Sequence, residues 1–284
     1  GAESDRGSLR VRIPSLLMEG RPMKRFGVLL LVVSGVGGGF GCSPDPAGES
    51  GAANAVQVAS AGDRYAAAPY LGELEERVLF GQIWKRRQLS ERDRAMITIA
   101  VTQALYQTDA LREYLNRALD TGITPDEIGE VMTHVTMYAG WPSGSNASRV
   151  VTDVFRTRGI PYPPAAAPVS MEIGLRGQDP SYPGLPYLSA LTRSVLFDER
   201  DGVWSRPGLS PRDRSMITVA VAQASFASDQ LRGHIGRALN NGVTPAEIGE
   251  VITHVTFYSG WPAGVNAAGI AGEVFEERNV SIDQ

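Results

Sequence analysis

The sequence predicts an all-α fold formed by a tandem duplication of one helical unit. The stretch "LSERDRAMITIAVTQA" (89–104) returns as "LSPRDRSMITVAVAQA" (209–224), and the offset of 120 residues holds without a gap through Phe155 and Phe275. More than half of the aligned positions are identical. No stretch alternates polar and apolar residues over a length that would require a sheet. A repeat of this length indicates two related helical bundles in one chain.

Each copy predicts four helices in the same order. In the first copy, Ser90 stands three residues before Asp93, a pattern typical of a helix N-cap. Thr124, Pro125 and Glu127 form a capping box with proline in the first turn. We expect helices over about 90–104, 109–122, 124–140 and 141–155, and over 210–224, 229–242, 244–260 and 261–275.

The segment before the first copy predicts export. Met23 and two basic residues precede a short apolar run, which is typical of a signal peptide and too short to cross a bilayer comfortably. Cys42 stands where a bacterial lipoprotein would be cleaved and acylated, so an N-terminal lipid anchor is the expected link to a membrane. The alternative is a buried N-terminal helix in a cytoplasmic protein. We interpret 1–22 as lying upstream of the initiator Met23, 23–42 as the signal peptide, 43–64 as a flexible linker, 65–160 as the first repeat, 161–185 as a proline-rich connector and 186–284 as the second repeat.

Composition excludes several classes of function. The net charge is −4 and the isoelectric point is about 5.5, which differs from the basic balance of nucleic-acid binders. The single cysteine excludes an intrachain disulfide, a CxxC redox pair and a cysteine-based zinc site.

One phrase carries rare residues twice, as "HVTMYAGWP" (134–142) and "HVTFYSGWP" (254–262). In the second copy Glu250, His254 and Tyr258 follow one another at spacings of four, so they share a helix face, with Trp261 at the turn beyond. The first copy repeats this with Glu130, His134, Tyr138 and Trp141. A Glu–His pair on a helix is as often an ion pair at an interface as a functional pair, and a tryptophan in such a turn usually fills a core. A metal site is not expected, because pseudo-symmetry separates the two matching histidines.

The stretches "LSPRDRSMITVAVAQA" and "QLRGHIGRALNNGVTPAEIGEVITHVTFYSGWPAGVNA" resemble the carboxymuconolactone decarboxylase family, within the AhpD-like all-α superfamily. The resemblance covers both copies and implies an orthogonal helical bundle that pairs with a second copy. A tandem chain is then expected to supply that pair internally. It is also expected to form a homo-oligomer, with three chains completing a ring.

The resemblance implies one of two chemistries. The AhpD-like branch reduces peroxides or disulfides through a CxxC pair, but here Ala227 and Gln230 stand at the expected cysteine positions and Ser215 at that of a proton-relay glutamate. This redox activity is therefore disfavoured, since no thiolate can act as nucleophile. The decarboxylase branch needs no cofactor and implies a lyase acting on a small carboxylated or lactone substrate. Such a site needs an apolar pocket, a donor near the developing oxyanion and an acid.

His234 matches the histidine that decarboxylase-like members carry, and it is the first candidate for the general acid or base. Arg214 is expected either to hold a substrate carboxylate or to pair with a neighbouring acid. His254 is the further catalytic candidate, oriented by Glu250, and the expected substrate-binding residues are Tyr258, Trp261, Glu250, His134, Tyr138 and Trp141.

The first copy has Tyr114 in place of His234, so we predict at most one functional pocket per chain. The alternative from another class is a non-catalytic duplicated scaffold whose two histidine faces pack as an interface. Dry packing of His234 and His254 would favour the scaffold, and a cavity reaching them would favour the enzyme.

Overall fold

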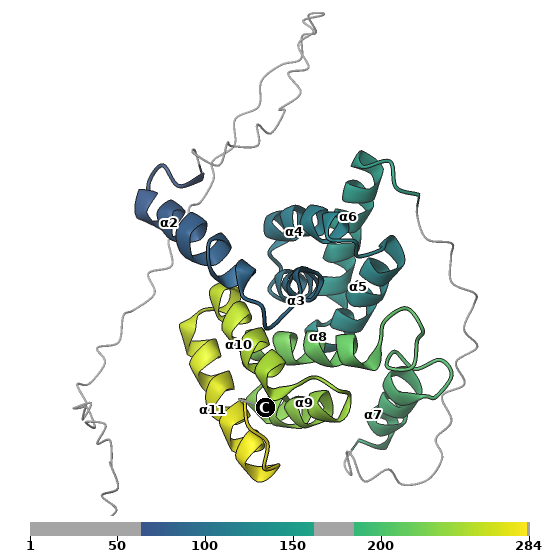
Figure 1. Cartoon of the computed structure of the whole chain (residues 1–284). Helices are drawn as coiled ribbons and strands as arrows, with labels where there is room; N and C mark the ends of the chain where they lie inside the picture. Colours follow the sequence, from purple (N-terminus) through teal and green to yellow (C-terminus); the bar gives the residue numbers. More distant parts are fainter. Residues whose placement is uncertain (1–63, 162–184, 283–284) are drawn as a thin grey trace, which may run out of the picture. The chain divides into compact units, whose positions relative to one another are not determined.

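The computed structural model describes residues 64–161 and 185–282, and every regular element in these ranges is a helix (Figure 1). The predicted all-α duplication is confirmed. The predicted signal peptide, the acylation site at Cys42, nearly all of the linker and most of the proline-rich connector lie outside the described residues. Within the described ranges, no helix is both long and apolar enough to cross a membrane.

The two repeats have matching helices, apart from one short 3-10 turn that is assigned in the first repeat alone among the described residues. The first contains α2 (Pro69–Leu74), the π-helical turn η1 (Glu75–Phe80), the short 3-10 turn η2 (Ile83–Lys85), α3 (Glu91–Ala104), α4 (Thr108–Asp120), α5 (Pro125–Ala139) and α6 (Trp141–Thr157). The second contains α7 (Pro186–Leu191), the π-helical turn η3 (Thr192–Phe197), α8 (Pro211–Ala224), α9 (Ser228–Asn240), α10 (Pro245–Ser259) and α11 (Trp261–Glu277).

The predicted helix caps are confirmed. The Ser90 hydroxyl accepts a hydrogen bond from the Asp93 amide at 3.0 Å, which begins α3. At the start of α5, Thr124 and Glu127 form both halves of the capping box. Gly140 ends α5 with a φ of +89°, a backbone conformation that favours glycine. The chain therefore turns sharply there and α6 begins at the next residue.

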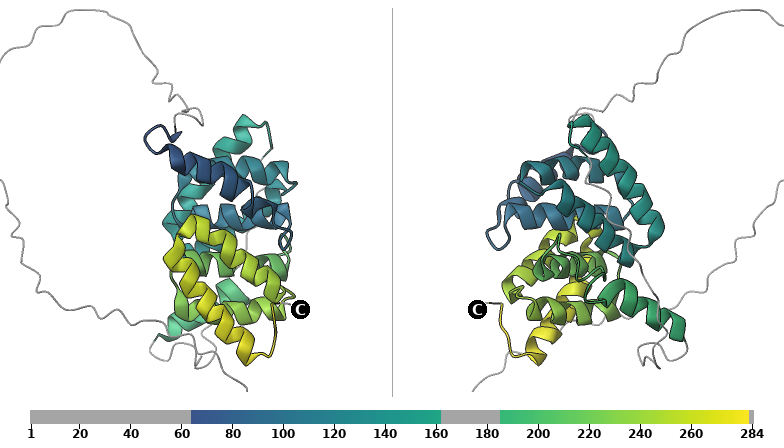
Figure 2. Two further views of the ribbon diagram at one scale, coloured as in Figure 1. Left: turned by 60° about the vertical axis from the view of Figure 1, so that its left-hand side comes forward. Right: turned by 90° about the vertical axis from the view of Figure 1, so that its right-hand side faces the viewer.

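Helices of each repeat pack on helices of the other repeat. The central helices α3 and α8 lie side by side, and nearly every residue of both is buried (Figure 1). In both repeats the last two helices are neighbours, as α10 and α11 show in the two views of Figure 2. However, α10 of the second repeat also packs on α3 of the first, and α5 of the first packs on α8 of the second. A single hydrophobic core therefore includes residues of both repeats.

Reciprocal ion pairs join the first turns of α3 and α8. Arg92 lies 3.1 Å from the Asp213 carboxylate, and Arg212 lies 3.2 Å from that of Asp93. The two aspartates are buried, and each also stands in the first turn of its helix, where a negative charge is favourable. These pairs fix the register of one repeat on the other.

Candidate functional site

The exchanged packing forms two related sites, each built from both repeats. The His234 site takes Glu130, His134 and Tyr138 from α5 of the first repeat and Trp204, Arg206, Arg214, Thr218, His234 and Arg237 from the second. The Tyr114 site takes Glu250, His254 and Tyr258 from α10 and Trp84, Arg86, Arg94, Thr98, Tyr114 and Arg117 from the first repeat.

This arrangement corrects one sequence-based expectation. We expected His234 to face His254, Tyr258 and Trp261, all from its own repeat. Instead, the His234 ring lies 5.4 Å from the ring of Tyr138, which belongs to the other repeat. The physical reason is that α5 and α10 each pack on the central helix of the opposite repeat. The sequence pattern predicts which residues share a helix face, but not which helix packs against that face.

The innermost histidine of the His234 site is a neutral buried ring. His134 is fully buried, and its Nε2 lies 2.8 Å from the Thr218 hydroxyl. Because Thr218 donates its own proton to the Arg214 carbonyl, it accepts from Nε2–H, and this assigns the tautomer. Burial, and then the charge of Arg214, lower the pKa of His134 to about 3. His134 is therefore uncharged at neutral pH.

His254 occupies the same position in the Tyr114 site. Its Nε2 bonds Thr98 at 2.8 Å, and its Nδ1 lies 3.4 Å from Nη1 of Arg94. Burial, and then the charge of Arg94, lower its pKa to about 3. Both ring nitrogens are engaged and the ring is fully buried. This geometry gives His254 a structural setting, in which Glu250 reaches it through Arg94 rather than directly.

A triad of one glutamate and two arginines lies beneath each histidine, with one arginine of each triad fully buried and the other partly exposed. Glu130 accepts hydrogen bonds from Arg206 at 2.6–3.0 Å and from Arg214 at 3.1 Å. Burial alone would raise the pKa of the Glu130 carboxyl, but the hydrogen bonds and charges of the two arginines outweigh it and lower the pKa. Arg214 has 0% exposure and also donates to the Arg206 carbonyl at 2.8 Å. Of the two roles expected for Arg214, the structure therefore supports the ion pair with a neighbouring acid.

An aromatic wall lies above the triad in the His234 site. The Trp204 indole donates to the Tyr138 hydroxyl at 2.8 Å and is stacked parallel to the His234 ring, with centroids 6.5 Å apart. Both Trp204 and His234 are half-buried, so this end of the site reaches the surface. Burial raises the pKa of Tyr138, and its hydroxyl therefore keeps its proton at neutral pH.

Arg237 lies at the surface end of the site, which we call its mouth, and it was not predicted from the sequence. Its guanidinium lies 4.8 Å from the Trp204 ring and 5.0 Å from that of Phe197. Among residues 64–161 and 185–282, no carboxylate lies within ion-pair distance of it. Burial, and then the charge of Arg237, lower the pKa of His234 to about 4. The available signal was its position, three residues after His234 and matching Arg117.

The two tryptophans of the repeated phrase lie elsewhere. Trp141 is 75% exposed and Trp261 is 62% exposed, so the expectation that they line the histidine site is wrong. The reason is the glycine turn, after which each tryptophan becomes the first residue of a new helix and projects outward. Trp261 packs only at the surface, on Phe257 at 5.3 Å between centroids.

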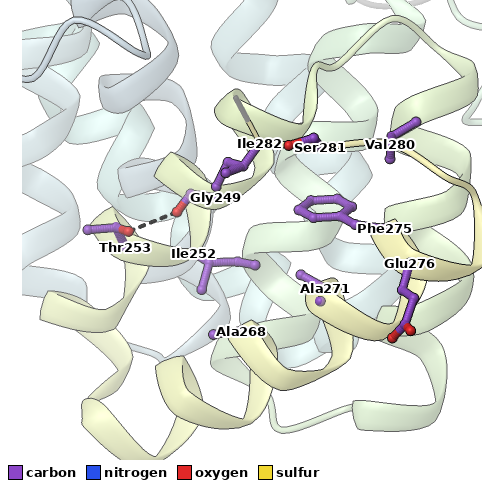
Figure 3. Close-up of a pocket in the computed structure, with 11 residues that line it drawn as sticks. Gly249, Ile252, Thr253, Ala268, Ala271, Phe275, Glu276, Val280, Ser281 and Ile282 are labelled. Carbon is purple, nitrogen blue, oxygen red and sulfur yellow. Dashed lines mark hydrogen bonds between the residues drawn. The ribbon is translucent and has the colours of Figure 1, made fainter. Parts of the chain in front are cut away.

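A separate apolar groove lies between α10 and α11. Figure 3 shows Ile252, Phe275, Val280 and Ile282 lining it, with the hydrogen bond from Thr253 to the Gly249 carbonyl at one edge. It shares no residue with either histidine site. In the described part of the chain, no group of three or more histidine, cysteine, aspartate or glutamate residues is placed to hold a metal ion.

Fold and sites together define a duplicated helical bundle in which both repeats contribute to each site. A model of the carboxymuconolactone decarboxylase family matches residues 69–153 and 194–273, more than half of the 284-residue chain. The chain belongs to this family.

Curated relatives match single stretches of the chain. A 4-carboxymuconolactone decarboxylase of Acinetobacter baylyi is 44% identical over 79 residues, which cover 28% of this chain and 59% of the relative. The nitrosuccinic acid decarboxylase npaB of Metarhizium robertsii is 40% identical over 65 residues, covering 23% and 46%. An uncharacterized 15.0 kDa protein of Paracoccus denitrificans is 33% identical over 78 residues, covering 27% and 58%. The chain thus spans about half the length of each of these relatives.

Proposed function

We propose that the chain is a carboxy-lyase that removes CO2 from a small carboxylated substrate, such as a carboxylated unsaturated lactone, at the His234 site. One observation carries the proposal: His234, Arg237 and Tyr138 adjoin one another at the surface end of this site. They provide a proton carrier, a cation that has no carboxylate partner among the described residues, and a hydroxyl group. Membership of the family, and two relatives named as decarboxylases, support the class of reaction.

The charge of the site favours an anionic substrate. Arg206 and Arg214 share the single carboxylate of Glu130, which leaves one positive charge, and Arg237 adds a second. The histidines add none at neutral pH, because their pKa values lie at about 3 and about 4. Such a concentration of positive charge attracts carboxylates from solution.

Decarboxylation moves negative charge within the substrate. The carbon–carboxylate bond breaks, CO2 leaves as a neutral molecule, and the electron pair delocalises to the lactone carbonyl oxygen. The Tyr138 hydroxyl accepts from Trp204 and interacts with Thr218, and it donates its proton to that oxygen once substrate binds. His234 then protonates the substrate carbon and regains a proton from water. One proton is taken up for each CO2 released, so the step balances.

Substrate binding favours the protonated form of His234. In the free protein the ring is neutral at pH 7, because burial and Arg237 disfavour the charged form. A bound carboxylate offsets the charge of Arg237 and favours the imidazolium. The pKa of His234 therefore rises in the complex, and a larger fraction of the rings carries the proton there than in the free protein.

The test is CO2 release from 4-carboxymuconolactone and from nitrosuccinic acid, the compounds in the names of the relatives. We expect turnover of at least one compound by the wild type, and a loss of about 100-fold or more in His234→Ala. Tyr114→Phe, at the matching position of the other site, serves as the control and keeps wild-type turnover. A folded His234→Ala protein with unchanged turnover would refute the assignment.

The scaffold interpretation has its own support in the structure. Of the two histidines whose packing separates the alternatives, His254 is fully buried, as expected of an interface between repeats, whereas His234 is half-buried. If neither compound loses CO2 and His234→Ala changes only stability, the scaffold becomes the better account.

A further inference from the structure

The Tyr114 site repeats the inner residues of the His234 site one for one. Glu250, His254 and Tyr258 on α10 match Glu130, His134 and Tyr138 on α5. The residues that face them from the first repeat are Trp84, Arg86, Arg94, Thr98 and Arg117. We propose that this is a second, dormant copy of the working site, held shut by Tyr114 and by the carboxylates of Glu113 and Glu75 at its mouth. The inference rests on the proposed function of the His234 site.

Tyr114 first engages the hydroxyl of Tyr258, which matches that of Tyr138 in the His234 site. The Tyr258 hydroxyl accepts from the Trp84 indole at 2.9 Å, as Tyr138 does from Trp204. Here, however, Tyr258 also donates to the Tyr114 hydroxyl at 3.2 Å. Tyr138 and Tyr258 each also interact with a threonine, Thr218 and Thr98, but of these two hydroxyls it is Tyr258 that donates to a second phenol. The two rings meet edge to face at 5.4 Å, as the rings of His234 and Tyr138 do, so the two sites differ here in the hydroxyl of Tyr114 and not in the ring contact.

Tyr114 also closes the mouth by packing. Its ring is stacked on Trp84 at 5.9 Å between centroids, and Arg117 lies 4.3 Å from the same indole. The equivalent distances in the other site are longer, at 6.5 Å and 4.8 Å. Trp84 is only 6% exposed, whereas Trp204 is half-buried. Trp204, behind the smaller ring of His234, is therefore more exposed than Trp84 behind Tyr114.

The inner layer is tighter on the Tyr114 side as well. Nη1 of Arg94 reaches Nδ1 of His254 at 3.4 Å. The equivalent atoms of Arg214 and His134 are buried and have no hydrogen-bond partner. The His234 site therefore lacks the hydrogen bond that joins the inner arginine and histidine of the Tyr114 site.

Carboxylates at the mouth weaken the attraction of the Tyr114 site for an anion. Arg64 bonds Glu113 at 3.0 Å and lies 3.9 Å from Glu75, and the Tyr65 hydroxyl donates to Glu75 at 2.8 Å. Two carboxylates against the guanidinium of Arg64 contribute −1 beside Tyr114. Arg117 and the excess arginine of the Glu250 triad contribute +2, so the Tyr114 site is one charge less positive than the His234 site. Both carboxylates raise the pKa of that phenol, after the larger effect of burial.

The second repeat has no such carboxylates. Gly233 stands at the position of Glu113 and Thr192 at that of Glu75. The two mouths therefore differ in charge and in size at the same three positions.

A transplant of two residues tests the proposal. His234→Ala removes the proposed acid of the working site, and Glu113→Gly with Tyr114→His then gives α4 the residues that α9 carries. We expect the triple variant to recover at least about a tenth of wild-type turnover of the compound that the wild type decarboxylates. In a chain that keeps His234, Glu113→Gly combined with Tyr114→His should raise turnover per chain up to twofold, because both sites would then work. A triple variant that folds, by its helical circular dichroism and melting temperature, yet is no more active than His234→Ala overturns the proposal.

A second measurement separates this inference from the proposed function. In a chain carrying Trp141→Phe, Trp204→Phe and Trp261→Phe, Trp84 is the only indole, and iodide is an anionic quencher of its fluorescence. We expect weak quenching, rising severalfold when Glu113→Gly and Tyr114→His are added. Quenching that stays unchanged overturns the dormant site even if no compound is turned over. Absent turnover with increased quenching refutes the proposed function alone.

Discussion

The inner layers of the two sites are alike, and their mouths differ. Beneath each mouth the same residue types recur, with a threonine bonded to a neutral histidine at 2.8 Å and a glutamate bonded to two arginines. At the surface, one site has His234 and Gly233 where the other has Tyr114 and Glu113. The comparison teaches that duplication here preserved the parts that join the repeats and changed the parts that meet solvent.

The physical reason is that the inner residues also hold the fold together. Arg94 and Arg214 are each fully buried, and each pairs with a glutamate from the opposite repeat. Loss of either partner would leave a buried charge without compensation, which is costly in any protein. Residues at the mouth carry no such constraint, since water can solvate whatever replaces them.

The largest expected effect tests whether the inner layers are equivalent. Glu130→Gln and Glu250→Gln each remove the carboxylate beneath a fully buried arginine. We expect each to lower the free energy of unfolding by about 3 kcal/mol, measured by urea denaturation. The loss in Glu250→Gln should be at least as large, because its side chain is 2% exposed against 12% for Glu130.

An exposed ion pair provides the control for this experiment. Asp120 pairs with Arg158 at 2.7 Å, but its side chain is 64% exposed. Asp120→Asn should therefore cost less than about 1 kcal/mol. If either buried variant is as stable as this control, the two triads do not carry the role assigned to them.

A smaller effect sharpens the difference between the mouths. Arg237→Gln removes the cation beside His234, and Arg117→Gln removes its counterpart in the Tyr114 site. Loss of one charge-assisted contact should raise KM about tenfold in Arg237→Gln, with a smaller rise in Arg237→Lys. Arg117→Gln should leave KM unchanged. Equal KM values for the two glutamine variants would contradict the assignment of one working site.

Much of the fold follows from local sequence. The Ser90 cap, the capping box at Thr124 and the turn at Gly140 are short-range features, and each appears in the structure as expected. The shared face of Glu250, His254 and Tyr258 is also confirmed, with the last two rings 5.2 Å apart. These features depend on residues within about two helical turns, which the sequence places directly.

The composition of each site depends on contacts between repeats, which local patterns do not encode. His234 meets Tyr138 because α5 packs on α8 of the other repeat as well as on helices of its own repeat. Arg237 was missed because a lone arginine on a helix has no distinguishing neighbours in sequence. The outward position of Trp261 follows from the exact turn at Gly260, which reverses the face expected from helical spacing. The predicted oligomer and the export signal stay predictions.

The most direct test of the central claim is an NMR titration of the three histidine rings, with and without succinate as a stable carboxylate. In the free protein the His234 ring should stay neutral from pH 8 down to near its pKa of about 4, because burial and Arg237 disfavour its charged form. Saturating succinate should raise that pKa by at least about one unit, since an opposite charge favours the imidazolium, while His134 and His254 stay neutral. A His234 ring that titrates near its ordinary value of 6.5 and ignores succinate would contradict the account.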